Sequence, residues 1–237
     1  MHGRVTTSAF HAFSDPAALA SALAAAVCDR LNQAIAGRGH AILAVSGGTT
    51  PKLFFRTLAQ TTLDWSKVTV ELVDERCVPP DSDQLNALLV QDNLMIGKAA
   101  AARFRPMFSY DAGSAEDAAR RAADALERPA DVLVLGMGND GHTASLFPDG
   151  DRLAEGLNPD GTARVIAMRA PHAGVPRLTR TLPEILAAGH LFLHIEGSEK
   201  RTVLDAALAG DDAMARPIRA VLHHPGIALD IYWAPKA

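Results

Sequence analysis

The chain contains 237 residues, of which 48% are hydrophobic, and its formal net charge is −4. This amount of apolar material supports a folded core and excludes a disordered protein. The weak negative charge excludes nucleic acid and anionic membranes as partners attracted by the overall field of the protein. Any bound anion must therefore be held by a local cluster of polar groups.

The cysteines argue against disulfide and zinc chemistry. Cys28 and Cys77 are the two cysteines, and neither belongs to a CxxC or histidine-rich pattern. A disulfide framework or a cysteine-based zinc site needs such spacing. Two reduced thiols are typical of a cytoplasmic protein, and we expect that location for this chain.

An alanine-rich segment near the N-terminus imitates a targeting signal. Ser14, Asp15 and Pro16 precede it, where an export signal would have basic residues. Apolar residues recur every fourth position through residues 19–35, Ser14 or Asp15 suits the N-cap, and Gly37 suits the end of a helix. We therefore predict an amphipathic first helix. No apolar run reaches the roughly 18 residues that would span a bilayer.

Strands and helices alternate along the rest of the chain. Compact apolar runs predict strands at 41–45, 68–73, 132–135, 165–168, 191–195 and 229–233, with less regular ones at 4–12 and 103–108. Helical patterns follow at 53–58, 82–94, 116–126, 181–188 and 201–208, where residues 177–181 lead into the fourth of these helices. This alternation predicts a single α/β domain over residues 1–237, with three αβα layers and a largely parallel, Rossmann-like sheet.

A glycine loop follows the predicted strand at 41–45. Ser46, Gly47, Gly48 and Thr49 lie between this strand and a helical pattern. Glycines let backbone N–H groups approach a phosphate, hydroxyls add donors, and a helix N-terminus adds partial positive charge. The loop therefore predicts an anion cradle. Two alternatives stay open, namely a turn without a ligand and a G-x-S-x-G nucleophile elbow in which Ala44 replaces the first glycine.

Three charged residues, Asp74, Glu75 and Arg76, follow the predicted strand at 68–73. A solvated loop is the default explanation for such a run. Polar residues directly after a buried strand are also candidates for a binding site, because ligands of open α/β sheets bind at the carboxyl ends of the strands.

The most informative loop follows the predicted strand at 132–135 and contains Asp140 and His142, separated by one glycine. Both side chains can project from an irregular loop into one cleft, and histidine is the usual general base near neutral pH. A single histidine in a glycine turn is more often structural. Here, however, Ser46, Asp74 and Lys200 also follow predicted strands, so a parallel sheet would bring all these loops to one edge.

Residues 136–141 also satisfy the G-x-G-x-x-G dinucleotide pattern. A Rossmann unit needs a full helix behind the third glycine, but Pro148 and Gly150 interrupt the pattern. No acidic residue ends a strand about twenty positions later, where a ribose would be bound. The pattern therefore does not predict a nucleotide site.

Several stretches of the chain resemble the 6-phosphogluconolactonase family. They are Ser46-Gly47-Gly48-Thr49-x-Pro51, Asp74-Glu75-Arg76, Gly136-x-Gly138-x-Asp140-Gly141-His142-Thr143-Ala144-Ser145-Leu146-Phe147-Pro148, Arg177-Leu178-Thr179, Gly197-Ser198-Glu199-Lys200 and His224-Pro225. The resemblance therefore extends over nearly the whole chain. The related glucosamine-6-phosphate deaminases share the Asp-Gly-His core but usually continue differently after the histidine, so residues 143–147 favour the lactonase.

The resemblance implies hydrolysis of 6-phospho-D-glucono-1,5-lactone in the pentose phosphate pathway. It implies that His142 is the general base and that Asp140 and Asp74 position the histidine or the sugar hydroxyls. It implies that the phosphate binds to the loop of residues 46–49, with counter-charges from the basic residues Lys200, Arg76 and Arg177.

The activity that the resemblance implies requires no metal ion or other cofactor. The expected partner is the small sugar-phosphate lactone, bound by a monomer or a weak homo-oligomer. Three alternatives remain at this stage. They are an isomerase or deaminase of an amino-sugar phosphate, a sugar-phosphate-binding protein without turnover, and a serine hydrolase built on Ser46. The intact Asp140–His142 pair argues against the second of these.

Overall fold

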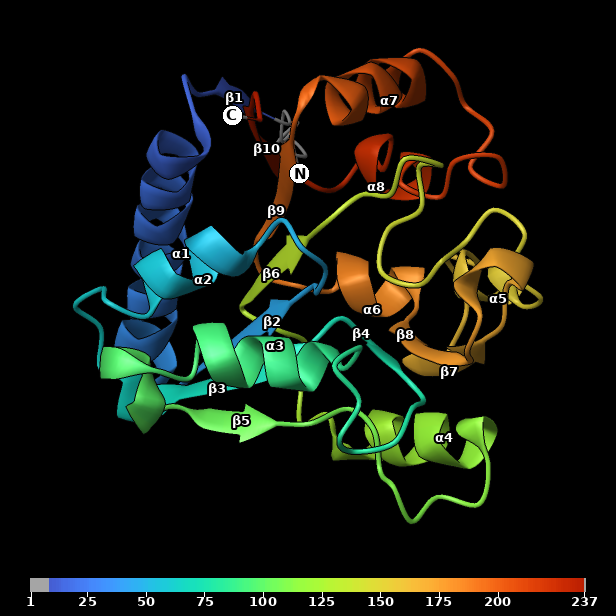
Figure 1. Cartoon of the computed structure of the whole chain (residues 1–237), viewed down its shortest axis with the longest axis horizontal. Helices are drawn as coiled ribbons and strands as arrows, with labels where there is room; N and C mark the ends of the chain where they lie inside the picture. Colours follow the sequence, from blue (N-terminus) through green and yellow to red (C-terminus); the bar gives the residue numbers. More distant parts are fainter. Residues whose placement is uncertain (1–8, 237) are drawn as a thin grey trace, which may run out of the picture.

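The computed structural model describes residues 9–236, and its main element is a seven-stranded sheet in the order β1-β10-β9-β6-β2-β3-β5 (Figure 1). The strands are β1 (Phe10–Ala12), β2 (Ala41–Val45), β3 (Val68–Leu72), β5 (Arg103–Arg105), β6 (Val132–Leu135), β9 (Leu191–Glu196) and β10 (Leu229–Ala234). Every neighbouring pair is parallel, so the carboxyl ends lie along one edge of the sheet. The prediction of a largely parallel α/β fold is confirmed.

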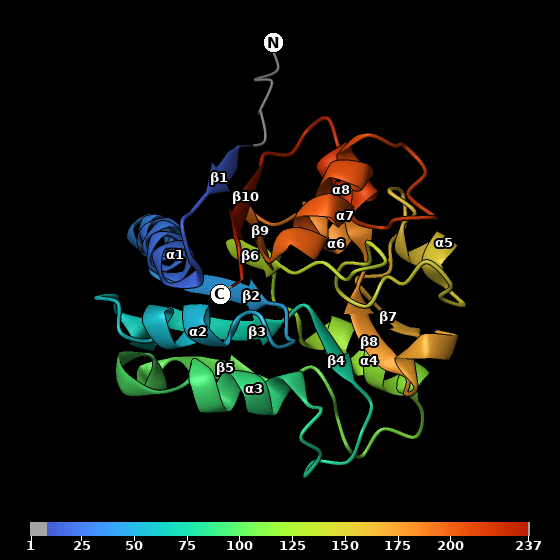
Figure 2. The ribbon, with the colours of Figure 1, turned by 45° about the horizontal axis from the view of Figure 1, so that its top comes forward.

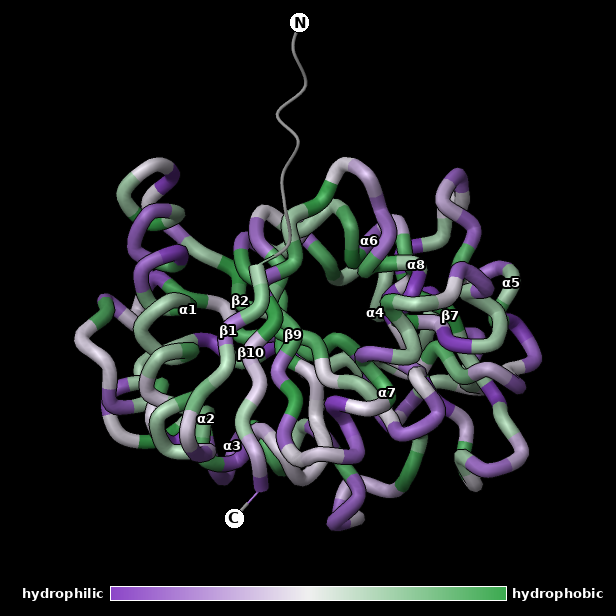
Figure 3. The backbone as a smooth tube through the Cα atoms, turned by 90° about the horizontal axis from the view of Figure 1, so that it is seen from above, coloured by the Kyte–Doolittle hydropathy of each residue, from purple (hydrophilic) through white to green (hydrophobic). Residues whose placement is uncertain are grey.

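Helices cover both faces of the large sheet (Figures 1 and 2). One face carries α1 (Pro16–Arg38), α2 (Lys52–Leu58) and α3 (Asn86–Asn93), and the other carries α6 (Leu182–Leu186), α7 (Ser198–Leu208) and α8 (Arg219–Leu222). Leu43 and Val45 of β2 pack in the hydrophobic cluster of the first face, whereas Ile42 and Ala44 pack in that of the second. Figure 3 shows the strongly hydrophobic β2 and β9 near the centre of the molecule.

The first helix, α1, has the N-terminal cap that the sequence predicts. Asp15 accepts a hydrogen bond from the backbone N–H of Ala18 at 2.8 Å, and Pro16 opens the helix. Gly39 ends α1 in place of the expected Gly37, because Gly39 adopts the left-handed φ of 78° that closes a helix. Within residues 9–236, no helix combines the length and apolar character of a membrane span.

Two of the less regular strands are shorter than expected. In the predicted strand at 4–12, residues 4–8 lie outside the described part of the chain, and β1 occupies residues 10–12. The predicted strand at 103–108 ends at Arg105. The connecting elements are α4 (Ala115–Ala125), α5 (Leu153–Gly156) and short 3₁₀ turns at Trp65–Lys67, Gly97–Ala101 and Pro171–Ala173. Because α5 is the first helix after β6, no helix packs directly behind the glycine loop as a dinucleotide site would require.

A second, antiparallel sheet has the order β4-β8-β7 and was not predicted from the sequence. It consists of β4 (Asp74–Arg76), β8 (Arg177–Arg180) and β7 (Val165–Met168). The interpretation of residues 74–76 as a solvated loop is wrong, because Asp74 and Glu75 are buried and paired with β8. Residues 177–181 lead into a helix as expected, since α6 begins at Leu182, but residues 177–180 form β8, a strand that was not predicted.

A buried charge joins the two sheets. Arg180 of β8 is fully buried, and its guanidinium binds the carboxylate of Glu71 on β3. It also donates to Glu184 of α6 over 3.3 Å and to the backbone carbonyl of Leu72 over 3.0 Å. The small sheet is therefore attached to the large one by hydrogen bonds that are buried away from water.

Replacing Arg180 with methionine should strongly destabilise the protein. The substitution leaves Glu71 and Glu184 buried without one of their cations, which typically costs about 3–5 kcal/mol. Urea unfolding followed by circular dichroism measures this loss. The matched control is Arg120→Met, because Arg120 is 70% exposed and pairs with Asp117 at the surface, where an ion pair is worth at most about 1 kcal/mol. Equal stability of the two variants would contradict the structural role of Arg180.

Candidate active site

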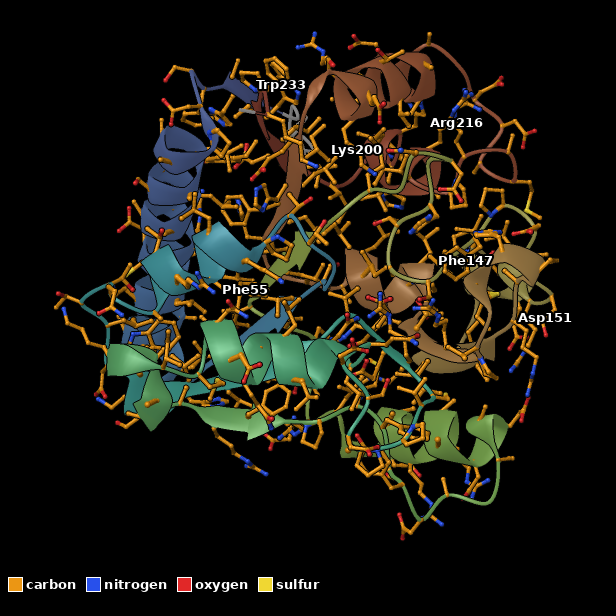
Figure 4. The ribbon with its side chains drawn as sticks, in the orientation of Figure 1. Phe55, Phe147, Asp151, Lys200, Arg216 and Trp233 are labelled. Atoms are coloured by element: carbon orange, nitrogen blue, oxygen red, sulfur yellow. The ribbon has the colours of Figure 1, made fainter. Side chains whose placement is uncertain are left out.

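A cavity of about 410 Å³ lies at the carboxyl edge of the large sheet. The loops that follow β2 and β6 line it, together with residues of β4, β8, the end of β9 and α7. Phe55 of α2, Phe147 of the loop after β6 and Lys200 of α7 reach it from separate parts of the chain (Figure 4). Every predicted site residue lines this cavity except Asp140, which contacts it through His142.

Local backbone contacts shape the loop that carries the predicted base. The N–H of Gly138 donates to the carbonyl oxygen of His142 at 2.8 Å, and the N–H of Gly141 donates to that of Gly138 at 3.1 Å. Position 138 requires glycine, because a Cβ atom would lie 2.1 Å from Nδ1 of His142 and 2.5 Å from Oδ1 of Asp140. The loop therefore folds its backbone so that these two side chains meet above Gly138.

Asp140 and His142 form a hydrogen-bonded pair. Oδ1 of Asp140 accepts the backbone N–H of His142 at 3.1 Å and lies 2.6 Å from Nδ1 of the ring. Because an ionised carboxylate can only accept, Nδ1 carries a proton, and in the neutral imidazole Nε2 then has the lone pair. In this tautomer His142 can take a proton from a molecule in the cavity.

The low pKa of Asp140 keeps this carboxylate ionised beside His142. Partial burial raises the pKa, but the hydrogen bond and charge of His142 and the nearby backbone N–H groups outweigh burial and lower the pKa to about 2. Asp140 is therefore ionised near neutral pH and remains an acceptor for His142.

The second predicted carboxylate, Asp74, is 7% exposed and belongs to β4. Its Oδ2 accepts a hydrogen bond from the hydroxyl of Ser145 at 2.6 Å, and the N–H of Ser145 donates to Oγ1 of Thr179 at 3.1 Å. The neighbouring Ala144 has a φ of 52°, which is uncommon for a residue other than glycine. Asp74 thus contacts the loop of His142 through Ser145, whereas Asp140 contacts the imidazole itself.

The glycine loop after β2 presents backbone and hydroxyl groups to the same cavity. The N–H of Ser46 donates to the carbonyl oxygen of Val134 at 3.0 Å, which ties the loop to β6. A Cβ atom on Gly47 would lie 1.8 Å from Oδ1 of Asn86, and Gly48 has a φ of 96°. Ser46 Oγ is buried without a hydrogen-bond partner among residues 9–236, so it lacks the adjacent base that a serine nucleophile needs.

Two arginines lie side by side at the opposite wall. Arg76 of β4 and Arg177 of β8 are directly paired in the antiparallel register, and like charges in this arrangement repel. Arg76 donates to the carbonyl of Gln84, and Nη2 of Arg177 donates to that of Ala173 at 3.0 Å. Burial, followed by the charge of Arg76, lowers the pKa of Arg177. An anion between the two guanidinium groups would relieve this repulsion.

Lys200 adds a third cation near the loop of His142. It lies in the first turn of α7, and its Nζ donates to the carbonyl oxygen of Met137 at 2.6 Å. Burial lowers the pKa of Lys200, while the charge of Asp140 opposes that effect. The lysine is therefore held at a fixed position and is partly desolvated, both of which favour anion binding.

The buried polar atoms without a partner are concentrated in this cavity. Within residues 9–236 they are Ser46 Oγ, Arg76 Nε, Asn86 Oδ1, Arg177 Nε and His194 Nδ1, and all five residues line the cavity. Buried polar side-chain atoms are usually hydrogen-bonded in folded proteins. Their concentration here points to a polar ligand.

The cavity is also lined by residues that were not predicted as site residues from the sequence, among them Asn86, His172, His194 and Lys236. Asn86 stands against Gly47, and His172 contacts the Asp140 side chain. His172 follows the predicted strand at 165–168, which was a usable signal. No sequence spacing relates His172 to Asp140, however, because the contact joins two loops.

The remaining reactive groups do not add a second centre. Burial raises the pKa of Cys77 to about 11, so this thiol is protonated near neutral pH and is a poor nucleophile. No group of three or more His, Cys, Asp or Glu side chains that could hold a metal ion occurs in the described part of the chain.

Comparisons with known proteins agree with this geometry. A family model described as glucosamine-6-phosphate isomerases/6-phosphogluconolactonase matches residues 14–233. The 6-phosphogluconolactonase of Rhizobium meliloti (strain 1021) is 55% identical over 95% of this chain and 98% of that protein. The 6-phosphogluconolactonase of Mesorhizobium japonicum is 51% identical over 95% of each chain.

Solved structures lead to the same family. The crystal structure of a 6-phosphogluconolactonase from Shewanella baltica OS155 has a TM-score of 0.92 and 39% sequence identity, and the match covers 98% of this chain and 100% of that one. Because the family model and the close relatives both extend over nearly the full length, the chain belongs to the glucosamine-6-phosphate isomerase/6-phosphogluconolactonase family.

Proposed function

We propose that this protein hydrolyses 6-phospho-D-glucono-1,5-lactone to 6-phosphogluconate, a step of the pentose phosphate pathway, without a metal ion and with His142 as general base. The observation that carries the proposal is the short contact between Nδ1 of His142 and the ionised Asp140. This contact leaves Nε2 of the neutral His142 ring free to accept a proton beside a cavity lined by four cationic side chains, namely Arg76, Arg177, Lys200 and Lys236.

In the proposed reaction, Nε2 of His142 takes a proton from a water molecule as the water oxygen bonds to the lactone carbonyl carbon. The carbonyl oxygen becomes an oxyanion, which N–H groups of the loops or Arg76 would stabilise. The tetrahedral intermediate then collapses, the bond from the carbonyl carbon to the ring oxygen breaks, and the proton on His142 passes to that oxygen. A lactone is already reactive, so general-base help of about 10²–10⁴-fold suffices.

The rest of the cavity would hold the substrate. The loop of residues 46–49 with Lys200 and Arg177 would bind the 6-phosphate, because N–H groups, hydroxyls and fixed cations suit a doubly charged anion. Asp74 would accept hydrogen bonds from sugar hydroxyls, since it lines the cavity and contacts Ser145 instead of His142. In this arrangement the phosphate anchors one end of the lactone while His142 acts at the other.

The second candidate is deamination of an amino-sugar phosphate, since the family includes isomerases of this kind. The close relatives at 55% and 51% identity carry the name 6-phosphogluconolactonase, which favours lactone hydrolysis. Ammonia release from glucosamine 6-phosphate, measured beside lactone hydrolysis, separates the two activities. Hydrolysis above the spontaneous rate that persists in EDTA would support the proposal, and ammonia release without hydrolysis would refute it.

His142→Ala should lower kcat by about 10²–10⁴-fold and leave KM nearly unchanged, because the variant loses the base but keeps the binding groups. A pH-stat measures the acid released by lactone hydrolysis, with the spontaneous rate subtracted. His11→Ala is the control, because His11 is an exposed imidazole beside Asp230 at the far edge of the sheet. Near-normal turnover in His142→Ala would rule out His142 as the base.

Lys200→Ala should weaken binding of the phosphorylated lactone by about tenfold or more, because a hydrogen bond to a charged group contributes about 1.5–3 kcal/mol. The diagnostic comparison uses D-glucono-1,5-lactone, which has no phosphate. Its kcat/KM should be equally low in wild type and variant, whereas a loss shared by both lactones would place the role of Lys200 in the Met137 loop. The exposed Lys67→Ala serves as control.

Asp140→Asn should reduce kcat at every pH from 5 to 8, because wild-type Asp140, with a pKa of about 2, keeps its charge throughout this range.

The stabilising effect of the Asp140 carboxylate is complete above the unfolded-state pKa near 3.8 and is lost as the pH falls towards 2. Thermal unfolding should therefore show a difference in Tm between wild type and variant that shrinks below pH 4. A Tm difference that grows on acidification would contradict the lowered pKa.

A further inference from the structure

A second histidine, His172, contacts both the ring of Phe147 and the carboxylate of Asp140. It belongs to the 3₁₀ turn Pro171–Ala173, which follows β7. Its ring meets Phe147 edge-on, with 5.1 Å between the centroids, and the ring of His142 lies 4.7 Å from the same phenyl group. Phe147 is 5% exposed and therefore gives both imidazoles a fixed surface.

Both nitrogens of His172 face carboxylates. Nε2 lies 3.5 Å from Oδ2 of Asp140, and Nδ1 lies 3.0 Å from Oδ2 of Asp149. Asp140 therefore has a different histidine at each of its oxygens, since its Oδ1 contacts Nδ1 of His142. The four side chains form one row that runs from Asp149 through His172 and Asp140 to His142.

Only the cationic form of His172, with a proton on each ring nitrogen, suits both of these contacts. A neutral imidazole has one N–H donor and one lone pair, so it can donate to one of the two carboxylates and turns a lone pair towards the other. The imidazolium has two donors and serves both. The contact with Asp149 is a hydrogen bond at 3.0 Å, whereas the contact with Asp140 at 3.5 Å is an ion pair and therefore depends on the charge of the imidazolium.

We propose that His172 in its cationic form is a positioning residue for the reaction, which holds the free oxygen of Asp140 so that the other oxygen stays on Nδ1 of His142. This inference rests on the proposed function. His172 does not exchange a proton with the substrate in this role, and it acts through Asp140. The carboxylate is 36% exposed, so a second contact restricts a side chain that would otherwise have room to rotate.

Charged groups from three elements surround His172. Asp140 contacts it from the loop after β6 and Asp149 from the segment before α5, whereas the like charge of Arg177 on β8 lies 5.9 Å from the Phe147 centroid. The side chain of His172 is 48% exposed, where an ion pair is worth at most about 1 kcal/mol, or fivefold in rate. The expected effect of losing it is therefore about twofold to fivefold.

The kinetic test compares wild type, His172→Phe and His172→Lys at pH 6 and pH 8.5. Phenylalanine keeps the ring against Phe147 but has no donor, and lysine supplies a permanent cation. His172→Phe should lower kcat about twofold to fivefold at pH 6 with KM unchanged, and the ratio to wild type should be closer to one at pH 8.5, because imidazole side chains in general change charge between pH 5 and 8. His172→Lys should exceed His172→Phe at both pH values. His11→Phe is the control, because it removes an exposed imidazole near a carboxylate elsewhere.

Three results would overturn the inference. The first is a loss of kcat in His172→Phe that is the same at both pH values, which would indicate packing alone. The second is a change confined to KM, which would indicate contact with the substrate. The third is a kcat equal to wild type at pH 6. Should His172→Phe unfold, His172→Gln, which is neutral and polar, carries the same expectation.

A measurement without substrate separates this inference from the proposed function. Nitrogen-15 NMR of the imidazoles follows the His142 Nδ1 signal as the pH is lowered through the titration of His172. That signal should respond to the His172 titration in wild type and not in His172→Phe. A response that persists in His172→Phe would refute the coupling even if the lactone is hydrolysed normally. Coupling without lactone hydrolysis would instead refute the proposed function.

Discussion

The geometry of the cavity depends on the buried guanidinium of Arg180. A charge without exposure to water is tolerated because Glu71 and Glu184 compensate it, and both carboxylates are in turn bound by the outer arginines Arg105 and Arg164. Losing one member leaves an uncompensated charge, so the network holds β8 to β3 and α6. Arg177 lies on the same strand as Arg180, and β4 is paired with that strand. The anchor of Arg180 therefore fixes one complete wall of the cavity.

A rigid wall explains how two like charges can remain adjacent. Arg76 and Arg177 are neighbours on paired strands, and each has a buried Nε atom without a partner among residues 9–236. Free side chains would move apart, but the backbone pairing of β4 and β8 prevents this. Part of the folding free energy is thus used to keep cations together before the anion arrives, which reduces the ordering needed on binding. Burial and, after it, the charge of Arg76 lower the pKa of Arg177.

The sequence predicts the large sheet and the Asp140–His142 pair well for a shared physical reason. Apolar strands of four to six residues and the glycine loops between them are local features. Local features can be recognised in the order of residues along the chain. Asp140 and His142 are two positions apart, and their contact needs little more than the turn that Gly138 permits. The small antiparallel sheet escapes prediction because β4 has three residues and its partner β8 lies about a hundred positions away. His172 is missed because its contact with Asp140 joins two loops that no sequence spacing relates.

The run Asp74-Glu75-Arg76 shows what a sequence pattern lacks. In a strand, successive side chains point to opposite faces, so Asp74 and Arg76 line the cavity while Glu75 points away from it. Glu75 accepts the backbone N–H groups of Asn86 and Ala87 at 2.8 and 2.7 Å and thereby caps α3. Burial raises the pKa of Glu75, although these N–H groups oppose the shift. The cap holds Asn86 against Gly47. The buried carboxylate of Glu75, which does not line the cavity, therefore influences the shape of the predicted phosphate loop. The three consecutive charged residues have different roles because they belong to a strand and not to a loop.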